Sequence, residues 1–135
     1  MTHFMIDHLA HRTPLVDPAQ AGAVFDDAVQ EILPHGGCGQ TLWLGSENAD
    51  PELRIDIDIE ADRAAVTWLS DASIGVELEP GPPITVMSSV DEPLTMIPAE
   101  RARVRAATAR QLVIEYLTTG TKPNTVAWTP VSSSA

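Results

Sequence analysis

Hydrophobic and polar positions alternate with a period of two through the middle of the chain. In "LRIDIDIE", residues 53–60, isoleucines alternate with acidic residues, which is the pattern of a strand with one buried face. Five segments share this character: "TLWLG", "LRIDIDIE", "AAVTWLS", "IGVELE" and "ITVMSS". The turn-forming stretches "SENADPE", "ADR", "SDAS" and "PGPP" separate them. Such short connections favour antiparallel pairing.

Two further segments repeat with the period of a helix. The first begins at Asp17, a natural N-cap followed by Pro18, and its apolar stripe ends before Pro34. The second runs from about Pro98 to Thr119 and is closed by Gly120. Its stripe is rich in alanine, leucine and valine. We also expect an edge strand in "HFMID" and a last strand in "NTVAWTP".

The predicted element order is β-α-β-β-β-β-β-α-β. Two helices with one apolar stripe each can cover one face of a sheet. We therefore predict an α+β fold, with a mainly antiparallel sheet of five to six strands and both helices on one face. The length suits a single domain over residues 1–135, with 131–135 as a frayed tail. Hydrophobic residues make up 44% of the chain, as in globular proteins.

Strand alternation also predicts what the other face of the sheet presents. If the isoleucines of 53–60 and Ile74, Val76 and Leu78 point to the helices, the intervening carboxylates point away. These carboxylates are Asp56, Asp58, Glu60, Glu77 and Glu79. By the same argument, Leu42 and Leu44 inward would place Trp43 outward. An outward tryptophan beside acidic groups would be a candidate binding residue. The sequence leaves open whether Trp43 has this role or packs under the first helix. For Trp68 and Trp128 we expect places in the core.

The net charge is −11, and it is unevenly distributed. Between Glu47 and Glu92, 12 acidic residues, Asp71 among them, face two basic ones, which gives −10. Such a chain would be repelled by the phosphates of nucleic acid. No apolar run is long enough for a membrane helix, and we expect no secretory signal in the N-terminal residues. With a single cysteine, Cys38, the chain is expected to be cytoplasmic.

Metal and catalytic sites are weakly supported. Alternate residues on one strand face, such as Asp56 and Asp58, lie about 7 Å apart, which is far for one cation. A glycosidase-like pair fits by separation only. His8 and His11 lack further ligands, and Cys38 has no nucleophilic setting. "HGGCGQ" lacks the lysine of a phosphate loop. We expect no enzyme activity, no cofactor and no bound metal.

The C-terminal run "IPAERARVRAATARQLVIEYLTTGTKPNTVAW" resembles the end of the type-one immunity proteins of bacterial polymorphic toxin systems. The family ending "FLxTGxRPxxVxW" corresponds here to "YLTTGTKPNTVAW", with Tyr116 and Lys122 as the departures. "LRIDIDIEADRAAVTWLSD" is similar to the family's paired strands, and "DPAQAGAVFDDAV" occupies the place of its first helix. The resemblance covers about Asp17 to Trp128, and these motifs are structural rather than catalytic.

The resemblance implies an antidote that binds a cognate toxin domain, often a nucleic-acid deaminase or a nuclease, and blocks its active site. A toxin that acts on nucleic acid needs a basic substrate groove, which an acidic surface can occupy. The expected partner-binding residues are Trp43, Asp56, Asp58, Glu60, Asp71, Glu77 and Glu79. We expect no direct nucleic-acid or membrane binding and a monomer when free. Two alternatives stay open: a small ligand-binding or enzymatic α+β domain, and an adaptor that self-associates through a sheet edge.

Overall fold

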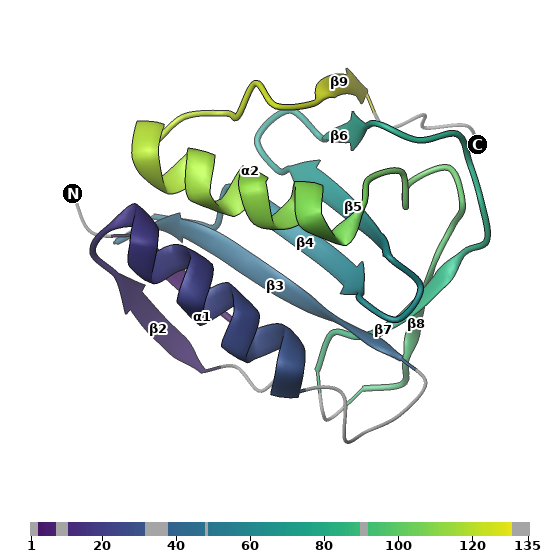
Figure 1. The fold of residues 1–135 in the computed structure, drawn as a ribbon, viewed down its shortest axis with the longest axis horizontal. Helices are drawn as coiled ribbons and strands as arrows, with labels where there is room; N and C mark the ends of the chain where they lie inside the picture. The colour runs from purple at the N-terminus through teal and green to yellow at the C-terminus, as the bar shows by residue number, and fades with distance from the viewer. Residues whose placement is uncertain (1–2, 8–10, 32–37, 48, 90–91, 131–135) are drawn as a thin grey trace.

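The computed structural model describes residues 3–7, 11–31, 38–47, 49–89 and 92–130 (Figure 1). In this part of the chain the elements follow one another as β1 (His3–Ile6), β2 (Arg12–Leu15), α1 (Pro18–Glu31), β3 (Gly39–Ser46), β4 (Leu53–Asp58), β5 (Arg63–Trp68), β6 (Ser73–Val76), β7 (Ile84–Met87), β8 (Thr95–Ile97), α2 (Ala106–Thr119) and β9 (Ala127–Pro130). No helix among the described residues is long and apolar enough to cross a membrane.

One sheet runs in the order β2-β1-β3-β4-β5-β6-β9, and all neighbours in it pair antiparallel. β7 pairs parallel with the first residues of β3, and β8 pairs antiparallel with β7. At Gly39, where β3 meets β7, the backbone of Ile57 lies so close that no side chain would fit. The mainly antiparallel α+β fold predicted from the sequence is thus confirmed, although the sheet of the described residues has nine strands rather than five to six.

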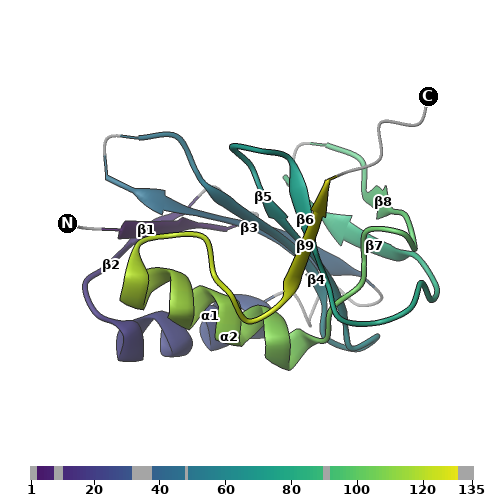
Figure 2. The same ribbon diagram turned by 90° about the horizontal axis from the view of Figure 1, so that it is seen from above.

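Both helices pack on the same face of this sheet, as predicted (Figure 2). The core between helices and sheet is built by the alternate residues of β3, β4 and β5 and by one stripe of each helix. Its buried members include Phe25 and Val29 of α1, Leu42, Leu44, Leu53, Ile55, Ile57, Val66 and Trp68 of the sheet, and Leu112, Val113 and Tyr116 of α2. Trp68 is a core residue, as expected, and Trp128 is half-buried against the same cluster.

Local signals fix the start of α1 and the end of α2. Asp17 accepts a hydrogen bond from the backbone N–H of Gln20 at 2.8 Å, and the side chain of Gln20 accepts one from the N–H of Val16. This is the predicted N-terminal cap of α1. At the end of α2, Gly120 adopts the left-handed conformation, with φ of 70°, that glycine tolerates best.

Three boundaries differ from the sequence prediction. α2 begins at Ala106, not near Pro98, because Val104 forms a bridge with Ala64 of β5 and holds the preceding residues extended. β4 ends at Asp58 and β6 ends at Val76, so the acidic residues beyond them lie outside strands. The short strands β2 and β8 were not predicted. Residues 131–135, expected as a frayed tail, lie outside the described residues.

The face of the sheet opposite the helices, called here the second face, is partly covered. β8 lies above it in Figure 2, and a smaller apolar cluster joins Ala65 of β5 to Ile84, Val86, Ile97 and Ala102. Ile74 also belongs to this face, because it pairs with Thr67. The predicted orientation of β6 was therefore wrong. Gly75, which has no side chain, occupies the position facing the helices, close to Val66.

Candidate functional site

Trp43 and Arg54 form a platform on the second face of the sheet. They are paired residues of the neighbouring strands β3 and β4. Leu42 and Leu44 on either side of Trp43 are fully buried against the helices, so Trp43 points away from them and is half-buried. The guanidinium carbon of Arg54 lies 5.7 Å from the centre of the Trp43 ring, within the range of a cation–π contact. The packing of Trp43 under the first helix, left open by the sequence, does not occur.

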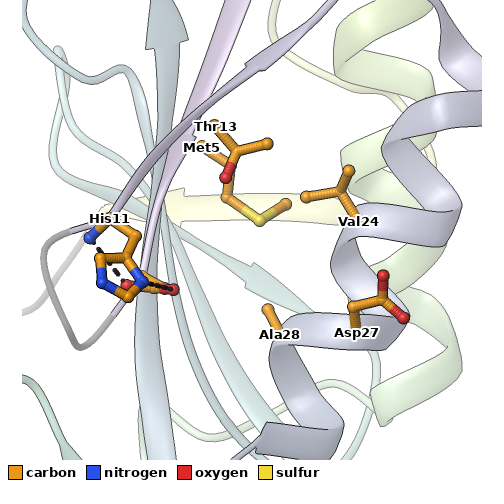
Figure 3. A pocket seen from close by; sticks show the side chains of 7 residues that line it. Met5, His11, Thr13, Val24, Asp27 and Ala28 are labelled. Carbon is orange, nitrogen blue, oxygen red and sulfur yellow. Dashed lines mark hydrogen bonds and ion pairs between the residues drawn. The ribbon is translucent and has the colours of Figure 1, made fainter.

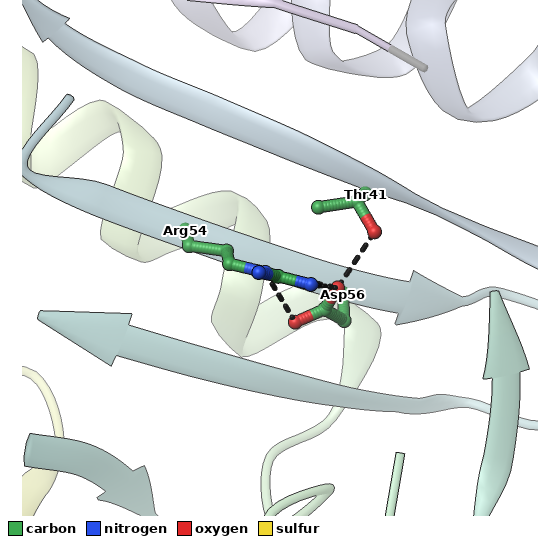
Figure 4. Close-up of polar contacts among 3 residues, drawn as sticks. All are labelled: Thr41, Arg54 and Asp56. Atoms are coloured by element: carbon green, nitrogen blue, oxygen red, sulfur yellow. Dashed lines mark hydrogen bonds and ion pairs between the residues drawn. The ribbon is translucent and has the colours of Figure 1, made fainter. Parts of the chain in front are cut away.

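Asp56 holds Arg54 in this position (Figure 4). Its carboxylate accepts hydrogen bonds from Nε and Nη2 of Arg54 at 3.2–3.3 Å and from the hydroxyl of Thr41 at 2.7 Å. Asp56 was expected to face solvent, and this is wrong. It is only 3% exposed, and a carboxylate buried in this way needs such hydrogen-bond partners. Asp56 therefore affects the surface indirectly, by fixing the position of the Arg54 side chain.

Two hollows meet at Arg54. The first, the Trp43 hollow, has a volume of about 360 Å³ and is lined by Trp43, Arg54, Ser88, Ser89, Glu92 and Thr95. The second, the β8 groove, has a volume of about 300 Å³ and lies between β8 and strands β4 and β5. Its lining includes Arg54, Ala65, Leu69, Ala72, Met96 and Arg101. Both hollows open on the second face, so they extend the platform into a continuous surface.

The β8 groove exposes large apolar side chains. Met96 is 67% exposed and Leu69 is 38% exposed, and Leu94, next to β8 in the chain, is 50% exposed. Val16 is the other large exposed apolar residue in the part of the chain that the structure describes. Exposed apolar side chains that gather around one groove are typical of recognition surfaces.

Asp58 and Glu60 lie at the turn that follows β4. One carboxylate oxygen of Asp58 accepts hydrogen bonds from the backbone N–H groups of Glu60 and Ala61. Asp58 therefore stabilises the turn, as acidic residues in this position commonly do. Glu60 is exposed, and its carboxylate has no hydrogen bond or ion pair among the described residues.

Glu77 stabilises the start of α2. Its carboxylate accepts hydrogen bonds from the backbone N–H of Arg105 at 2.9 Å and from the hydroxyl of Thr108. Asp62, from the turn after β4, accepts one from the N–H of Ala106. Two carboxylates distant in sequence thus accept from two backbone N–H groups at the start of this helix. Glu79 is exposed, and it binds Arg63 only through its backbone carbonyl.

Asp71 forms an ion pair with Lys122, with Nζ and Oδ2 2.7 Å apart. Hydrogen bonds from Lys122 and then from Ser73 lower the pKa of Asp71 to about 2. The contact ties the turn after β5 to the loop between α2 and β9. The predicted site residues therefore lie at three places: the platform, the end of the sheet near the start of α2, and this turn.

A further pocket, of about 200 Å³, lies between β1, β2 and α1 (Figure 3). The backbone N–H of His11 donates to Asp7 at 2.9 Å, and its ring Nδ1 lies 3.7 Å from the same carboxylate.

No group of three or more His, Cys, Asp or Glu residues that could hold a metal occurs among the described residues. His8, named with His11 from the sequence, lies outside them. Cys38 is buried, and burial raises the pKa of its thiol, which favours the unreactive form.

Sequence reasoning missed Arg54, Met96 and Arg101 as surface residues. Arg54 carried a signal, because it shares a strand face with Asp56 at a spacing of two residues. Met96 and Arg101 carried none, since β8 has only three residues and no periodicity to read. The arrangement offers an aromatic ring, guanidinium groups and apolar side chains, which suit recognition of another molecule.

The family model of immunity protein Imm1 matches residues 6–130, nearly the whole chain. The match spans β2 to β9 and therefore includes both helices and the strands that carry the platform and the β8 groove. Comparisons with curated proteins and with solved structures return no match.

Proposed function

We propose that this chain, which belongs to the Imm1 family of immunity proteins, binds a cognate toxin domain and blocks its active site. The match of the family model over residues 6–130 is the observation that carries this proposal. Membership in an immunity family implies a protein that neutralises by binding. The chain itself needs no catalytic activity for that role. Its place of action is then the cytoplasm, and it meets the toxin as a monomer.

The proposed toxin acts on nucleic acid, as a deaminase or a nuclease. The charge of the chain supports this choice, because a net charge of −11 suits a partner with a basic substrate groove. Opposite charges on the two proteins would speed their encounter. The acidic chain would thus compete with the toxin's own polyanionic substrate.

The proposed contact surface contains the seven residues named from the sequence. The contacts of each residue suggest its role. Trp43, stacked by Arg54, is the aromatic anchor. Asp56 positions that anchor through Arg54. The other carboxylates, which lie in the turn after β5 and at the end of the sheet near the start of α2, are the proposed acidic contacts: Asp58, Glu60, Asp71, Glu77 and Glu79. Of these, Glu60 and Glu79 are exposed with carboxylates that make no bond among the described residues, so they contribute most to attraction.

Co-expression with the toxin domain encoded beside the immunity gene tests the function. Cells that produce the toxin together with this protein should survive, and the two chains should co-purify. Trp43→Ala should raise the dissociation rate of the complex by about tenfold, because a buried aromatic anchor mainly sets that rate. Trp128→Ala, on the helix side of the sheet, is the control for loss of a half-buried tryptophan. Death of cells that hold both folded proteins would refute the proposal.

A further inference from the structure

The β8 groove carries the features of a binding site for a segment of another protein chain. β8 pairs with β7 along one edge, and no hydrogen bond reaches its other edge from the described residues. The other two outer strands, β2 and β9, each contain a proline, Pro14 and Pro130. Proline at an edge discourages further strand pairing. Since β8 contains no proline, it is the outer strand whose backbone can accept another strand.

The side chains of the groove indicate what such a strand would carry. Met96 and Leu69 offer exposed apolar surface, and Ala72 lies beside them with a positive φ of 55°. Ala72 lies in the turn between β5 and β6, and its small side chain leaves space beside Leu69 and Met96. A large apolar side chain of the partner would therefore fit between Met96 and Leu69.

The charge of the groove is opposite to that of the whole chain. Arg54 and Arg101 line it together with one carboxylate, Asp56, so its lining has a net charge of +1 in a chain of −11. Arg54 binds Asp56 through Nε and Nη2, which leaves Nη1 without a bond among the described residues. Arg101 is exposed, and its side chain has no ion pair there either. Two guanidinium groups with free donors suit a carboxylate.

We infer that the β8 groove binds an extended segment of the toxin in which a large apolar side chain is followed by a carboxylate. The segment adds to the free edge of β8, places its apolar side chain against Met96 and Leu69, and directs its carboxylate to Arg54 and Arg101. This inference rests on the proposed function, and it adds an acidic contact on the toxin to the basic groove proposed above. Main-chain pairing supplies affinity, and the apolar and guanidinium contacts of the groove supply specificity, as in other cases of strand addition.

Matched variants distinguish the effect of contacts in the groove from the effect of the net charge of the chain on binding. Arg101→Glu and Arg12→Glu change the net charge equally, but only Arg101 lines the groove. Met96→Lys and Val16→Lys each remove an exposed apolar residue and add the same charge. All four positions are at the surface, so thermal unfolding should stay close to the wild type. The probe is the purified toxin domain, and the measurement is its dissociation rate from each variant.

We expect Arg101→Glu and Met96→Lys to raise the dissociation rate by about tenfold, while Arg12→Glu and Val16→Lys change it less than about twofold. Hydrogen exchange at residues 95–97 should slow in the complex, because new main-chain bonds form there. Equal rates for groove and control variants, with full neutralisation by all, would overturn the inference alone. Tighter binding by Arg101→Glu would assign the groove to a basic segment and overturn it. A wild type that does not bind the toxin overturns both proposals.

Discussion

At the scale of single residues, strand alternation predicts the face of a side chain but not its surroundings. Alternation placed Asp56 on the face away from the helices, which is correct. Its burial and its bond to Thr41 depend on β3 and on the cover formed by β7 and β8. The spacing of two residues places Arg54 beside Asp56 on one strand face, but the bond to Thr41 and the cover join different strands, so no local pattern encodes the burial. The same holds for Glu77, whose partner is the start of α2.

The Asp56 network should contribute to both stability and binding. Asp56→Ala leaves the Arg54 guanidinium without its partner in a partly covered site, which usually costs several kcal/mol for a buried pair. Because the side chain of Arg54 is 33% exposed, we expect a loss of about 2 kcal/mol in the free energy of unfolding. Asp56→Asn, which can keep the bond to Thr41, should lose less. Urea denaturation measures both values, and an unchanged midpoint for Asp56→Ala would contradict this role.

The ion pair of Asp71 predicts a dependence on pH. Its pKa is lowered to about 2 from an ordinary 3.8. The stabilising contribution of the carboxylate is therefore complete above the ordinary value and disappears as the pH falls through about 2. Wild type and Asp71→Asn should differ slightly in urea midpoint near pH 7, since exposed pairs contribute little. The difference should shrink between about pH 4 and pH 2. A difference that grows as the pH falls would contradict this assignment.

At the scale of elements, prediction succeeded where the signal is local. The first helix, with its cap at Asp17, and the end of the second, at Gly120, follow from capping residues and helical periodicity. The start of α2 was placed too early, because "IPAERARV" has good helix formers after a proline. Its extended path depends on the bridge from Val104 to Ala64, a tertiary contact. β8 has too few residues for any periodic pattern.

The cap supplied by Glu77 can be tested against a neighbour of the same type. Glu77→Ala should lower the free energy of unfolding by about 1 kcal/mol, as removal of a helix cap usually does. Glu79 lies two residues further along, and its carboxylate makes no such bond. Glu79→Ala therefore removes an equal charge without removing a cap, and it should leave the free energy of unfolding unchanged within about 0.5 kcal/mol. Thermal or urea unfolding compares the two. Equal losses would show that charge, rather than capping, explains the effect.

At the scale of the whole molecule, the placement of both helices on one face was predictable. Each helix has a single apolar stripe, and the strands offer one apolar face to receive it. The partial cover of the second face was not predictable, because β7 reaches the start of β3 by a parallel pairing between distant segments. The candidate site was therefore predicted in part. Trp43 was placed correctly, whereas the β8 groove is a product of the tertiary fold.

Charge should govern the speed of association. Reversing the two exposed carboxylates Glu60 and Glu79 to lysine should slow association with the toxin at low salt, because less attraction guides the encounter. Raising the salt concentration should remove the difference from the wild type. The dissociation rate should change little, since rim charges act mainly before contact. Stopped-flow binding at two salt concentrations measures this, and a salt-independent slowing would point to direct contact instead.

The central claim is that this chain neutralises a toxin by binding it, and titration of the purified toxin tests it most directly. The toxin's activity on its nucleic-acid substrate is measured while the protein is added in increasing amounts. We predict that inhibition increases linearly and is complete at one chain per toxin domain, as for a tight stoichiometric complex. Full toxin activity in the presence of a several-fold excess of folded protein would contradict the account.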